Sequence, residues 1–594
     1  MAKQKKTRAL SNILFALRWQ FRLTPGYVIL RFVQSIFGNV VTLFEHTFLL
    51  AYIISCVERG KTLVDVLKFL IPVAIAVAIK LISGPLIEAY LTPKANFKFY
   101  MHTRLALYKK ASQLEIAKYD DTAFYNDFVW AMHRAPEQIF NATGTFINLV
   151  SMFVTALIAG TYIVATDATA LIVVAGMMAS TLLLQHSITK RNMKREEELM
   201  PISRKRDYIN RVFYLADFVK DIKTGAISDK LKRDFTDTSE EMEQVAVKHG
   251  KAISWLAIAR DGISALAFDG AYLIYLFYQA LVKGKYGLGS LLAVYNAANR
   301  LSGNVRRVIM MLPRFEEQSL YIEKMRTFLE TENTMPDNGT LPVPSQGDLV
   351  LENVTFTYPG NDKPTINNVS MHIKQGEKIA LVGFNGAGKS TLIKLLLRLY
   401  DPDSGTVRLG DNAASEYPIR DYRQHFGALF QQFEIIATSI GQNLTMSDTP
   451  LDKEKADEVM KKAAFWDKLN SLPDGYDTPL TKEFDDNGVN LSGGEAQKIA
   501  LARVLYADAG VIVLDEPSSA LDPIAEYQLN KTVTELAEDK TVIIISHRLS
   551  TTRFVDKIYM LEDGRVIEQG NHDALLAQNG KYAEMFRLQA EKYR

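Results

Sequence analysis

The sequence has one cysteine in 594 residues, Cys56, and this scarcity excludes two kinds of protein. A lone thiol forms no disulfide framework within a chain and supplies no cysteine cluster for a structural metal. The charges are also nearly balanced, with a formal net charge of +2, so the positive excess typical of nucleic-acid-binding proteins is absent. We therefore expect no nucleic acid among the partners of this chain.

Long apolar runs are present, and they crowd into the N-terminal half. About six of them approach the 20-residue length that a bilayer requires. They lie at 28–57, 64–91, 138–165, 168–188, 253–282 and 288–312. Arg300 and several asparagines interrupt the last run, and a water-facing pore explains such polarity better than contact with lipid. The sequence thus predicts an α-helical membrane domain.

The distribution of Lys and Arg predicts the orientation of this domain. Basic residues are frequent at the N-terminus and in the long connections 94–134 and 190–251, whereas the opposite connections are short. The positive side of a membrane protein faces the cytosol, so we expect the C-terminal half there as well. Residues 1–24 carry basic and apolar side chains at helical spacing. They are interpreted as an amphipathic helix on the membrane surface, with a targeting peptide as the alternative.

A glycine-rich segment in the C-terminal half matches the phosphate-binding loop pattern G-x-x-x-x-G-K-[ST]. It lies between the apolar run 378–382 and the helix-like run 391–399. Its glycines allow backbone N–H groups to approach phosphates, and a helix N-terminus adds positive potential. We expect Lys389 to reach the β- and γ-phosphates of ATP and the Ser390 hydroxyl to bind Mg²⁺. The segment consists of Gly383, Phe384, Asn385, Gly386, Ala387, Gly388, Lys389 and Ser390, followed by Thr391.

Two further apolar runs, 511–514 and 541–545, have the composition of buried parallel strands. The first ends in Asp515 and Glu516, which places two carboxylates where a strand meets its loop. Asp515 is predicted to hold Mg²⁺ through water, and Glu516 to polarise the attacking water as general base. The second run is followed by His547. Together with the loop, these residues predict an ATP hydrolase.

With these motifs the chain resembles the ATP-binding-cassette (ABC) transporters. The resemblance assigns Gln431 to the Q-loop and Mg²⁺ site, His547 to the catalytic switch, and Tyr358 to stacking on adenine. The signature motif, expected to bind ATP in a partner cassette, is Leu491, Ser492, Gly493, Gly494 and Glu495; the D-loop is Ser519, Ala520, Leu521 and Asp522. Two residues depart from the usual family pattern: Glu495 replaces a commoner glutamine, and Asp486 replaces a glutamate.

The resemblance implies the exporter fold, in which a membrane domain is fused to one α/β P-loop cassette. The expected domains are an elbow segment (1–24), a transmembrane domain (25–330), a linker (331–347) and the ATP-binding domain (348–594). Short coupling helices are expected at 121–128 and 206–215. A chain with one cassette requires a second half-transporter, so we expect a homodimer, with a heterodimer left open. The expected location is a bacterial inner membrane, with the lipid bilayer as a further partner.

Ionisable residues within the apolar runs bear on the cargo of this chain. Glu45, His46, Asp269 and Arg300 are costly in a membrane unless they face water or pair, and they are the candidates for a polar cavity. Pairing between helices is the alternative. The segment 484–488 resembles that of exporters of small modified peptides, which favours a peptide or amphipathic cargo. A lipid flippase, a multidrug exporter and an ATP-gated channel or regulator remain as alternatives.

Overall fold

The computed structural model describes residues 9–215, 218–517, 531, 540–546 and 551–591. The chain divides into two compact units. The first, the helical unit, comprises Met1–Gln113 and Asn126–Thr331. The second, the cassette unit, comprises Leu114–Tyr125 and Glu332–Arg594. A short segment from the N-terminal half therefore belongs to the same unit as the C-terminal half.

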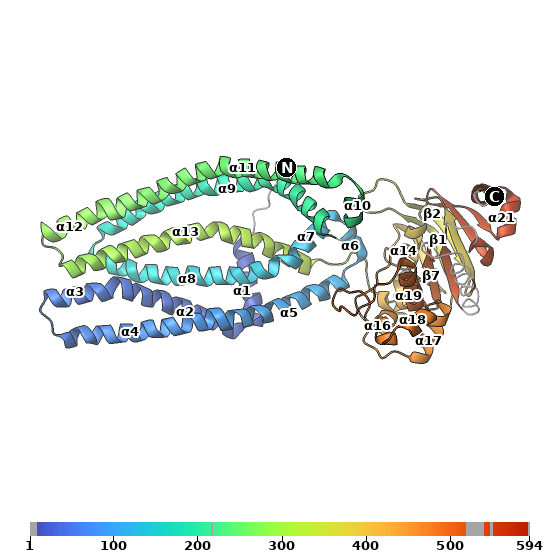
Figure 1. Ribbon diagram of the computed structural model, residues 1–594, viewed down its shortest axis with the longest axis horizontal. Coiled ribbons are helices and arrows are strands. Elements are labelled where there is room, and N and C mark those ends of the chain that lie inside the picture. Colours follow the sequence, from blue (N-terminus) through green and yellow to red (C-terminus); the bar gives the residue numbers. More distant parts are fainter. Residues whose placement is uncertain (1–8, 216–217, 518–530, 532–539, 547–550, 592–594) are drawn as a thin grey trace. The chain divides into compact units, whose positions relative to one another are not determined.

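The helical unit is built from long helices that run side by side (Figure 1). Short connections join them in pairs at one end. In chain order the elements are α1 (Ala9–Leu23), α2 (Pro25–Leu43), η1 (Phe44–Leu49), α3 (Leu50–Glu58), α4 (Leu63–Pro85), η2 (Leu86–Leu91), α5 (Thr92–Gln113), α7 (Thr122–His133), α8 (Ala135–Thr166), α9 (Thr169–Tyr214), α10 (Val219–Thr224), α11 (Ile227–Ala265), η4 (Leu266–Tyr272), α12 (Leu273–Leu281) and α13 (Leu288–Glu330).

Each of the six predicted spans falls on helical residues. Among the described residues, four helices are long and apolar enough to cross a membrane: Pro25–Glu58, Leu63–Gln113, Ala135–Thr166 and Thr169–Tyr214. The other two predicted spans fall on the α11–η4–α12 run and on α13, and their role as spans stays a prediction. In α13 the polar Asn304 is buried and donates a hydrogen bond to the Thr155 hydroxyl on α8 at 2.9 Å. At least one polar residue of α13 thus stabilises the packing of this helix against α8.

Three elements of the helical unit, η1, η2 and η4, are π-helical turns inside otherwise α-helical runs. Each includes one acidic residue, respectively Glu45, Glu88 and Asp269. A π-turn inserts an extra residue into the helix and recurs at functional sites in proteins. Neither the periodicity nor the composition of the sequence predicted these turns.

The first helix, α1, contacts α8 and α13 within the helical unit. Its Ile13 and Ala16 are buried, and the Asn12 amide donates to the Ser319 hydroxyl on α13 at 3.0 Å. The helical spacing of apolar residues predicted this amphipathic helix, although residues 1–8 lie outside the described part. The apolar face of α1 packs against α8 and α13.

One predicted coupling helix is wrong. Residues 206–214 do not form a separate short helix, because α9 continues through them to Tyr214 and ends only where Leu215 adopts an extended conformation. The short helix of this region is α10, further along the chain. The other candidate, 121–128, overlaps the start of α7, whereas the segment that belongs to the cassette unit begins at Leu114 and includes α6 (Ile116–Asp120).

The cassette unit contains a four-stranded antiparallel sheet and a six-stranded, mostly parallel sheet. The first has the order β2-β1-β4-β5 and the second β10-β9-β3-β8-β7-β6. The strands are β1 (Leu349–Phe356), β2 (Ile366–Ile373), β3 (Lys378–Gly383), β4 (Ser404–Leu409), β5 (Asn412–Ala413), β6 (Phe426–Leu429), β7 (Val511–Asp515), β8 (Thr541–Ile545), β9 (Lys557–Glu562) and β10 (Arg565–Gly570). The helices are α14 (Lys389–Leu396), α15 (Ile419–Gln424), α16 (Ile440–Thr445), α17 (Lys453–Lys462), α18 (Trp466–Ser471), α19 (Gly493–Tyr506), α21 (His572–Gln578) and α22 (Lys581–Glu591).

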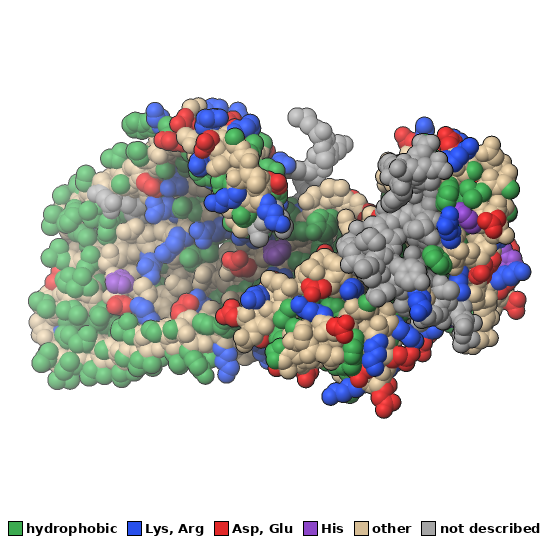
Figure 2. All heavy atoms as spheres, turned by 45° about the vertical axis from the view of Figure 1, so that its right-hand side comes forward, with side chains coloured by type: hydrophobic (Ala, Val, Ile, Leu, Met, Phe, Trp, Pro, Cys, Tyr) green, Lys and Arg blue, Asp and Glu red, His purple; other side chains and the backbone are tan. Residues whose placement is uncertain are grey.

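The central strands of the six-stranded sheet are buried on both faces, as their apolar composition predicted. Every residue of β7 and β8 is buried. Alternate residues of a strand point to opposite faces, so Ile512 belongs to one apolar core with α19, and Val513 to the other with α14. Parallel strands covered on both sides bring their carboxyl ends to one edge, and this edge carries the predicted nucleotide residues. The surface of the helical unit is largely hydrophobic in the view of Figure 2, whereas that of the cassette unit carries mixed charges.

Candidate nucleotide-binding site

The glycine-rich loop joins β3 to α14, as predicted. Gly388 has φ of +98°, and a side chain there would meet Ile366 Cδ1 at 2.8 Å and the Thr365 carbonyl oxygen at 3.0 Å. At Gly383 the obstacle is closer, with the Leu561 carbonyl oxygen 2.3 Å from an ideal Cβ. The loop therefore requires glycine at both positions, because the backbone is crowded and, at Gly388, left-handed.

Lys389 folds back over this loop. Its Nζ donates to the carbonyl oxygens of Gly383 at 2.8 Å and Phe384 at 3.0 Å, and the residue is only 9% exposed. Burial lowers the pKa of the Lys389 ammonium, and the nearby carboxylates of Glu516 and Asp515 offset this only in part. A buried ammonium held by neutral carbonyls is well prepared to receive an anionic group.

Two polar pairs stand beside the loop at the carboxyl ends of β7 and β6. The Ser390 hydroxyl donates to Asp515 Oδ2 at 3.3 Å, and Gln431 Nε2 donates to Glu516 Oε2 at 2.9 Å. Burial raises the pKa of the Asp515 carboxyl, and the negative charge of Glu516 adds to this effect, while the Ser390 hydroxyl opposes it. The structure thus brings Ser390, Gln431, Asp515 and Glu516 together with Lys389.

Glu516 has a left-handed backbone, with φ of +51°. Its own N–H donates to the Ile545 carbonyl oxygen at the end of β8 at 3.0 Å. A non-glycine residue in this conformation carries strain, and such residues gather at functional sites. The turn holds the Glu516 side chain toward Gln431 rather than along the strand.

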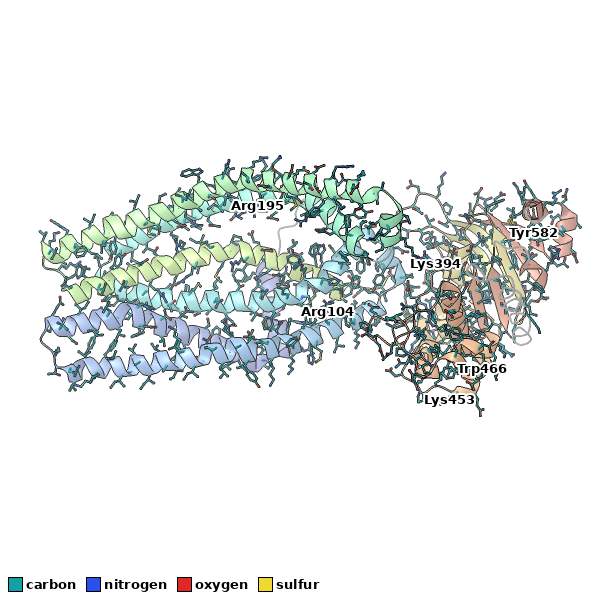
Figure 3. The ribbon with its side chains drawn as sticks, in the orientation of Figure 1. Arg104, Arg195, Lys394, Lys453, Trp466 and Tyr582 are labelled. Atoms are coloured by element: carbon teal, nitrogen blue, oxygen red, sulfur yellow. The ribbon has the colours of Figure 1, made fainter. Side chains whose placement is uncertain are left out.

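Tyr358 contacts two residues of α14. Its hydroxyl is 3.2 Å from the Thr391 hydroxyl, and its ring packs edge to face against Phe356 and Tyr400, with centroid distances of 5.0 and 5.4 Å. Lys394, labelled in Figure 3, reaches from α14 to within 5.3 Å of the Tyr358 ring centroid. Aromatic and cationic neighbours thus determine the plane of the ring.

The signature motif begins α19, and its first residues form a capping box. The Ser492 hydroxyl accepts from the Glu495 N–H at 3.3 Å, while Glu495 Oε2 accepts from the Ser492 N–H at 2.8 Å and its hydroxyl at 2.9 Å. The backbone hydrogen bond from Ser492 is the main reason that the pKa of Glu495 lies below its usual value. Glutamate and glutamine both serve in such a box, which explains why Glu495 can replace the commoner glutamine.

Leu491 is half-buried against the core of the cassette unit, and Gly493 and Gly494 form the first turn of α19. In the described part of the chain, the side-chain hydrogen bonds of the signature stay within the motif and with Lys468. His547 and the D-loop residues Ser519, Ala520, Leu521 and Asp522 lie outside the described residues. Their predicted roles stay predictions.

Two of the candidate cavity residues of the helical unit, Glu45 and His46, contact neighbouring helices. Glu45 forms an ion pair with Lys80 on α4 at 3.0 Å, and the backbone carbonyl of His46 accepts from the Asn296 amide at 3.1 Å. Arg300 is half-buried on α13. The side chain of Asp269 lies outside the described parts. Glu45 thus takes part in the pairing between helices that was the alternative to a cargo site.

Sequence reasoning did not single out Tyr400, Lys394 or Lys80. Tyr400 follows Leu399 and precedes an Asp-Pro turn, and this position alone gives no signal for a contact with Tyr358. Lys80 is one cation in an apolar run, and such a residue indicates a partner inside the membrane without identifying it. Pairs of this kind become visible only when two helices lie side by side.

Comparison with known proteins finds similarity in the segment that carries this site. Residues 366–519 match the ABC transporter family. Over 258 residues the chain is 40% identical to the ATP-dependent lipid A-core flippase of Aliivibrio fischeri, covering 43% of each chain. Over 362 residues it is 32% identical to the flippase of the same name from Vibrio cholerae, covering 60% of this chain and 61% of the relative. The matches therefore span less than two thirds of these relatives.

The fold extends the likeness to nearly the whole chain. A bacterial Atm1-family ABC exporter, solved with ATP bound, superposes with a TM-score of 0.78 and covers 96% of this chain and 98% of its own, at 22% identity. Residues 366–519, which carry the phosphate-binding loop, Gln431, the signature motif and Glu516, are thus similar to the ABC transporter family. More specifically, the chain shares the fold of this exporter, in which one N-terminal helical unit and one ATP-binding cassette follow each other in a single chain.

Proposed function

We propose that this protein is an ATP-driven exporter that works as a dimer by alternating access. The observation that carries the proposal is the cluster at the carboxyl edge of the six-stranded sheet. There Ser390 contacts Asp515 at 3.3 Å and Gln431 contacts Glu516 at 2.9 Å, beside the phosphate-binding loop. A module that binds ATP without hydrolysing it has no need of a carboxylate held here by a strained backbone, as that of Glu516 is.

In this proposal the loop 383–390 and Lys389 bind the phosphates of ATP, and Tyr358 stacks on adenine. Magnesium prefers oxygen ligands, and the Ser390 hydroxyl and Asp515 carboxylate provide them within 3.3 Å of each other, with Gln431 close by. The bound ion would neutralise developing charge on the phosphates. Glu516 accepts a proton from the attacking water, and Gln431 orients its carboxylate. His547 is proposed to assist at the same phosphate.

One chain has one phosphate-binding loop and one signature motif. We propose that Leu491 to Glu495 complete the ATP site of a partner chain, where the N-terminus of α19 and its Ser492 cap face the terminal phosphate. Both halves of a homodimer would then be competent, because the residues of both half-sites are present in one sequence. A heterodimer with another half-transporter remains the alternative.

For the cargo we propose an amphipathic molecule with an apolar body, and a lipid in particular. Two relatives named above are lipid A-core flippases, and this favours a lipid over the peptide that segment 484–488 suggested. An open groove of about 640 Å³ in the helical unit supports an apolar group, because five of its twelve lining residues are aromatic. They are Phe44, Phe48, Tyr52, Phe69 and Tyr162. The inner membrane of a bacterium is the proposed location.

ATP hydrolysis by the full chain, reconstituted in lipid vesicles, tests this function. Glu516→Gln is expected to lower turnover by about 10²- to 10⁴-fold while ATP binding persists, because a general base contributes that much. Glu454→Gln, the same change at an exposed glutamate of α17, is the matched control and should hydrolyse ATP normally. Equal turnover in the Glu516 variant and the intact chain would exclude the assignment of Glu516.

The same vesicles distinguish the proposed cargo from its alternatives. Transfer of a fluorescently labelled phospholipid between leaflets that requires ATP and stops in Glu516→Gln supports a lipid flippase. If ATP changes only ion conductance, with no transfer of lipid, the channel alternative is favoured. If lipids are not moved but amphipathic peptides or drugs stimulate hydrolysis, a peptide or multidrug exporter is favoured instead.

A further inference from the structure

A short strap of chain connects the two units in sequence, and one buried carboxylate holds it. The strap, residues 333–337, begins three residues after α13 ends at Glu330. Glu115 follows α5, which ends at Gln113, and belongs to the cassette unit together with the strap. Glu115 is only 6% exposed. The continuations of two long helices therefore meet at this residue.

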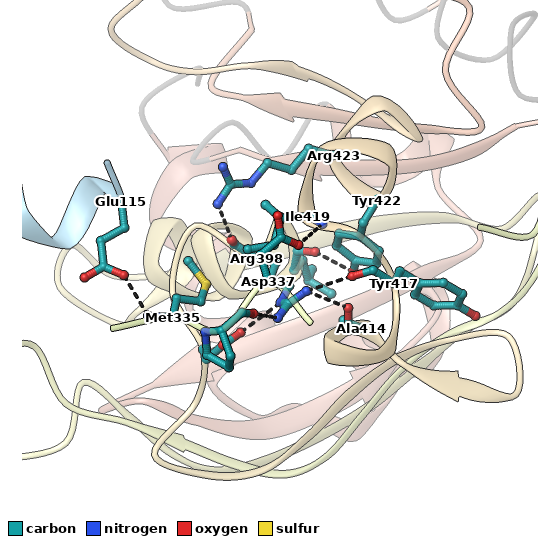
Figure 4. Close-up of polar contacts among 12 residues, drawn as sticks. Glu115, Met335, Asp337, Arg398, Ala414, Tyr417, Ile419, Tyr422 and Arg423 are labelled. Atoms are coloured by element: carbon teal, nitrogen blue, oxygen red, sulfur yellow. Dashed lines mark hydrogen bonds and ion pairs between the residues drawn. The ribbon is translucent and has the colours of Figure 1, made fainter. Parts of the chain in front are cut away.

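Glu115 binds the strap through several hydrogen bonds, of which Figure 4 shows the one to Met335. Its carboxylate accepts from the Thr334 hydroxyl at 2.6 Å, the Thr334 N–H at 3.0 Å and the Met335 N–H at 2.9 Å. Its own N–H donates to Asn333 Oδ1 at 3.1 Å, and Lys118 Nζ lies 3.5 Å from Oε1. Burial favours the neutral acid, but the bonds from Thr334 and Met335 outweigh it and lower the pKa of Glu115. These are charge-assisted bonds, the stronger kind in proteins.

The other side of the strap is bound to the end of the phosphate-loop helix. Arg398, just after α14, is 1% exposed, and its Nη2 donates to the Pro336 carbonyl oxygen at 2.8 Å. Its remaining donors reach the carbonyl oxygens of Ala414 and Tyr417 and the Asp401 carboxylate, at 3.0 to 3.1 Å. The next strap residue, Asp337, accepts from the Ile419 N–H at 2.9 Å.

Arg398, which follows α14 in the chain, is thus hydrogen-bonded to the strap, and the strap is hydrogen-bonded to Glu115. The helix α14 itself begins at Lys389 of the phosphate-binding loop. A flexible linker would need none of these bonds, and a purely structural linker would not need a buried carboxylate, whose removal from water is costly. A residue that transmits a movement benefits from several strong hydrogen bonds to one short stretch of backbone, because the residue and that stretch then move as a unit.

We propose that Glu115 is a positioning residue that ties the ends of α5 and α13 to the phosphate-loop helix, so that ATP binding in the cassette moves these helices. The inference rests on the proposed ATP-driven function. It assigns Glu115 no contact with nucleotide: the residue acts through the strap. Loss of the tie should uncouple the helices from ATP without weakening the nucleotide site itself.

The test uses the full chain in lipid vesicles and a label at the far end of the helical unit. Cys56→Ser removes the single cysteine, and Lys61→Cys in the exposed connection between α3 and α4 then takes a spin label. The readouts are the KM for ATP and the change in accessibility of the label to a water-soluble relaxing agent on adding MgATP. Glu115→Gln keeps the size of the side chain but places an N–H₂ group among backbone donors.

In Glu115→Gln we expect an unchanged KM for ATP, and an equilibrium constant for the MgATP-induced change that is lower by about 2- to 30-fold. Thr334→Val removes one hydroxyl donor with little change of shape, so it should reduce the response less, in the same direction. Glu332→Gln, the same chemical change at an exposed residue just before the strap, is the matched control and should respond fully.

A full label response in Glu115→Gln would overturn the inference. A raised KM with a lowered unfolding midpoint in both Glu115→Gln and Thr334→Val would also overturn it, because that pattern indicates a structural role alone. If the intact labelled chain neither hydrolyses ATP nor responds to it, the proposed function fails, and the inference fails with it. Hydrolysis with a response lost only in the variants supports the tie.

Discussion

The two units of this protein arrange their charged side chains in different ways. The cassette unit gathers Lys389, Ser390, Asp515, Glu516 and Gln431 at one edge of one sheet. The helical unit instead distributes its charges in separate pairs along several helices. These pairs include Glu45 with Lys80 at 3.0 Å, Glu88 with Arg31 at 2.6 Å, and Asp261 with Arg306 at 3.2 Å.

This difference follows from what each unit must do. Cleavage of a phosphate bond requires several polar and charged groups within hydrogen-bond distance of one ligand. The polar residues of the cassette unit therefore lie together. An ionisable group in an apolar environment requires only one partner to offset the loss of water, so the helical residues pair wherever two helices meet. A cluster therefore identifies a ligand, whereas isolated pairs identify only the contacts between helices. The three predictions below test this contrast.

The largest effect is expected in the helical unit. Glu45→Gln leaves the Lys80 ammonium without its partner, with both side chains less than a third exposed, and should destabilise the protein by about 1–3 kcal/mol. Thermal unfolding in detergent measures this change. Replacing Lys80 by Met in the same chain should restore the midpoint. If the double variant is stable but no longer exports cargo, Glu45 belongs to a cargo site and the contrast fails for this residue.

A smaller effect of opposite sign is expected in the cassette. Asp515→Asn removes a buried charge beside Glu516 and should raise the free energy of unfolding at neutral pH, without nucleotide, by about 0.5–2 kcal/mol. The folded pKa of Asp515 lies above its usual value, so acid protonates the folded protein first and relieves the same cost. The gain should therefore shrink as the pH falls through that folded pKa.

Urea unfolding of both chains across this pH range provides the measurement. The variant should also lose the dependence of ATP binding on magnesium, since an amide is a poorer ligand for the ion than a carboxylate. A destabilised variant at neutral pH would show that Asp515 serves packing rather than ligand binding.

The smallest effect is expected at the signature motif. Glu495→Gln keeps an oxygen that can accept from the Ser492 N–H and loses only the exposed ion pair with Lys468, so unfolding should change by less than about 0.5 kcal/mol. Ser492→Ala removes the cap itself and should cost about 1 kcal/mol. Similar losses in the two variants would contradict the capping-box explanation for glutamate at this position.

Much of the cassette could be predicted from the sequence because its chemistry constrains residue type and spacing together. The loop 383–390 requires glycine where Leu561 and Thr365 crowd the backbone. The apolar runs 511–514 and 541–545 are strands buried on both faces, as their composition predicted. The pairing of Gln431 with Glu516 was less accessible, because it depends on the left-handed turn at Glu516.

The helical unit was predictable as a set of helices but less so in its details. Helix continuity misled the prediction at 206–215, since the end of α9 depends on one extended residue, Leu215, that no glycine or proline announces. The π-turns at Glu45 and Glu88 were not predicted, because the apolar runs around them were read as uninterrupted helices.

By itself, the sequence determined the local features of this protein. They are apolar runs long enough for a bilayer, and a phosphate-binding loop, an acidic strand end and a signature motif in the order that resembles an ABC cassette. These features are local, since each depends on neighbours along the chain. The tertiary structure alone decided which distant residues meet. It placed Glu115 on the strap at Thr334 and Met335, and Lys80 against Glu45, because hydrogen bonds and ion pairs between distant segments depend on packing that no spacing in the sequence encodes.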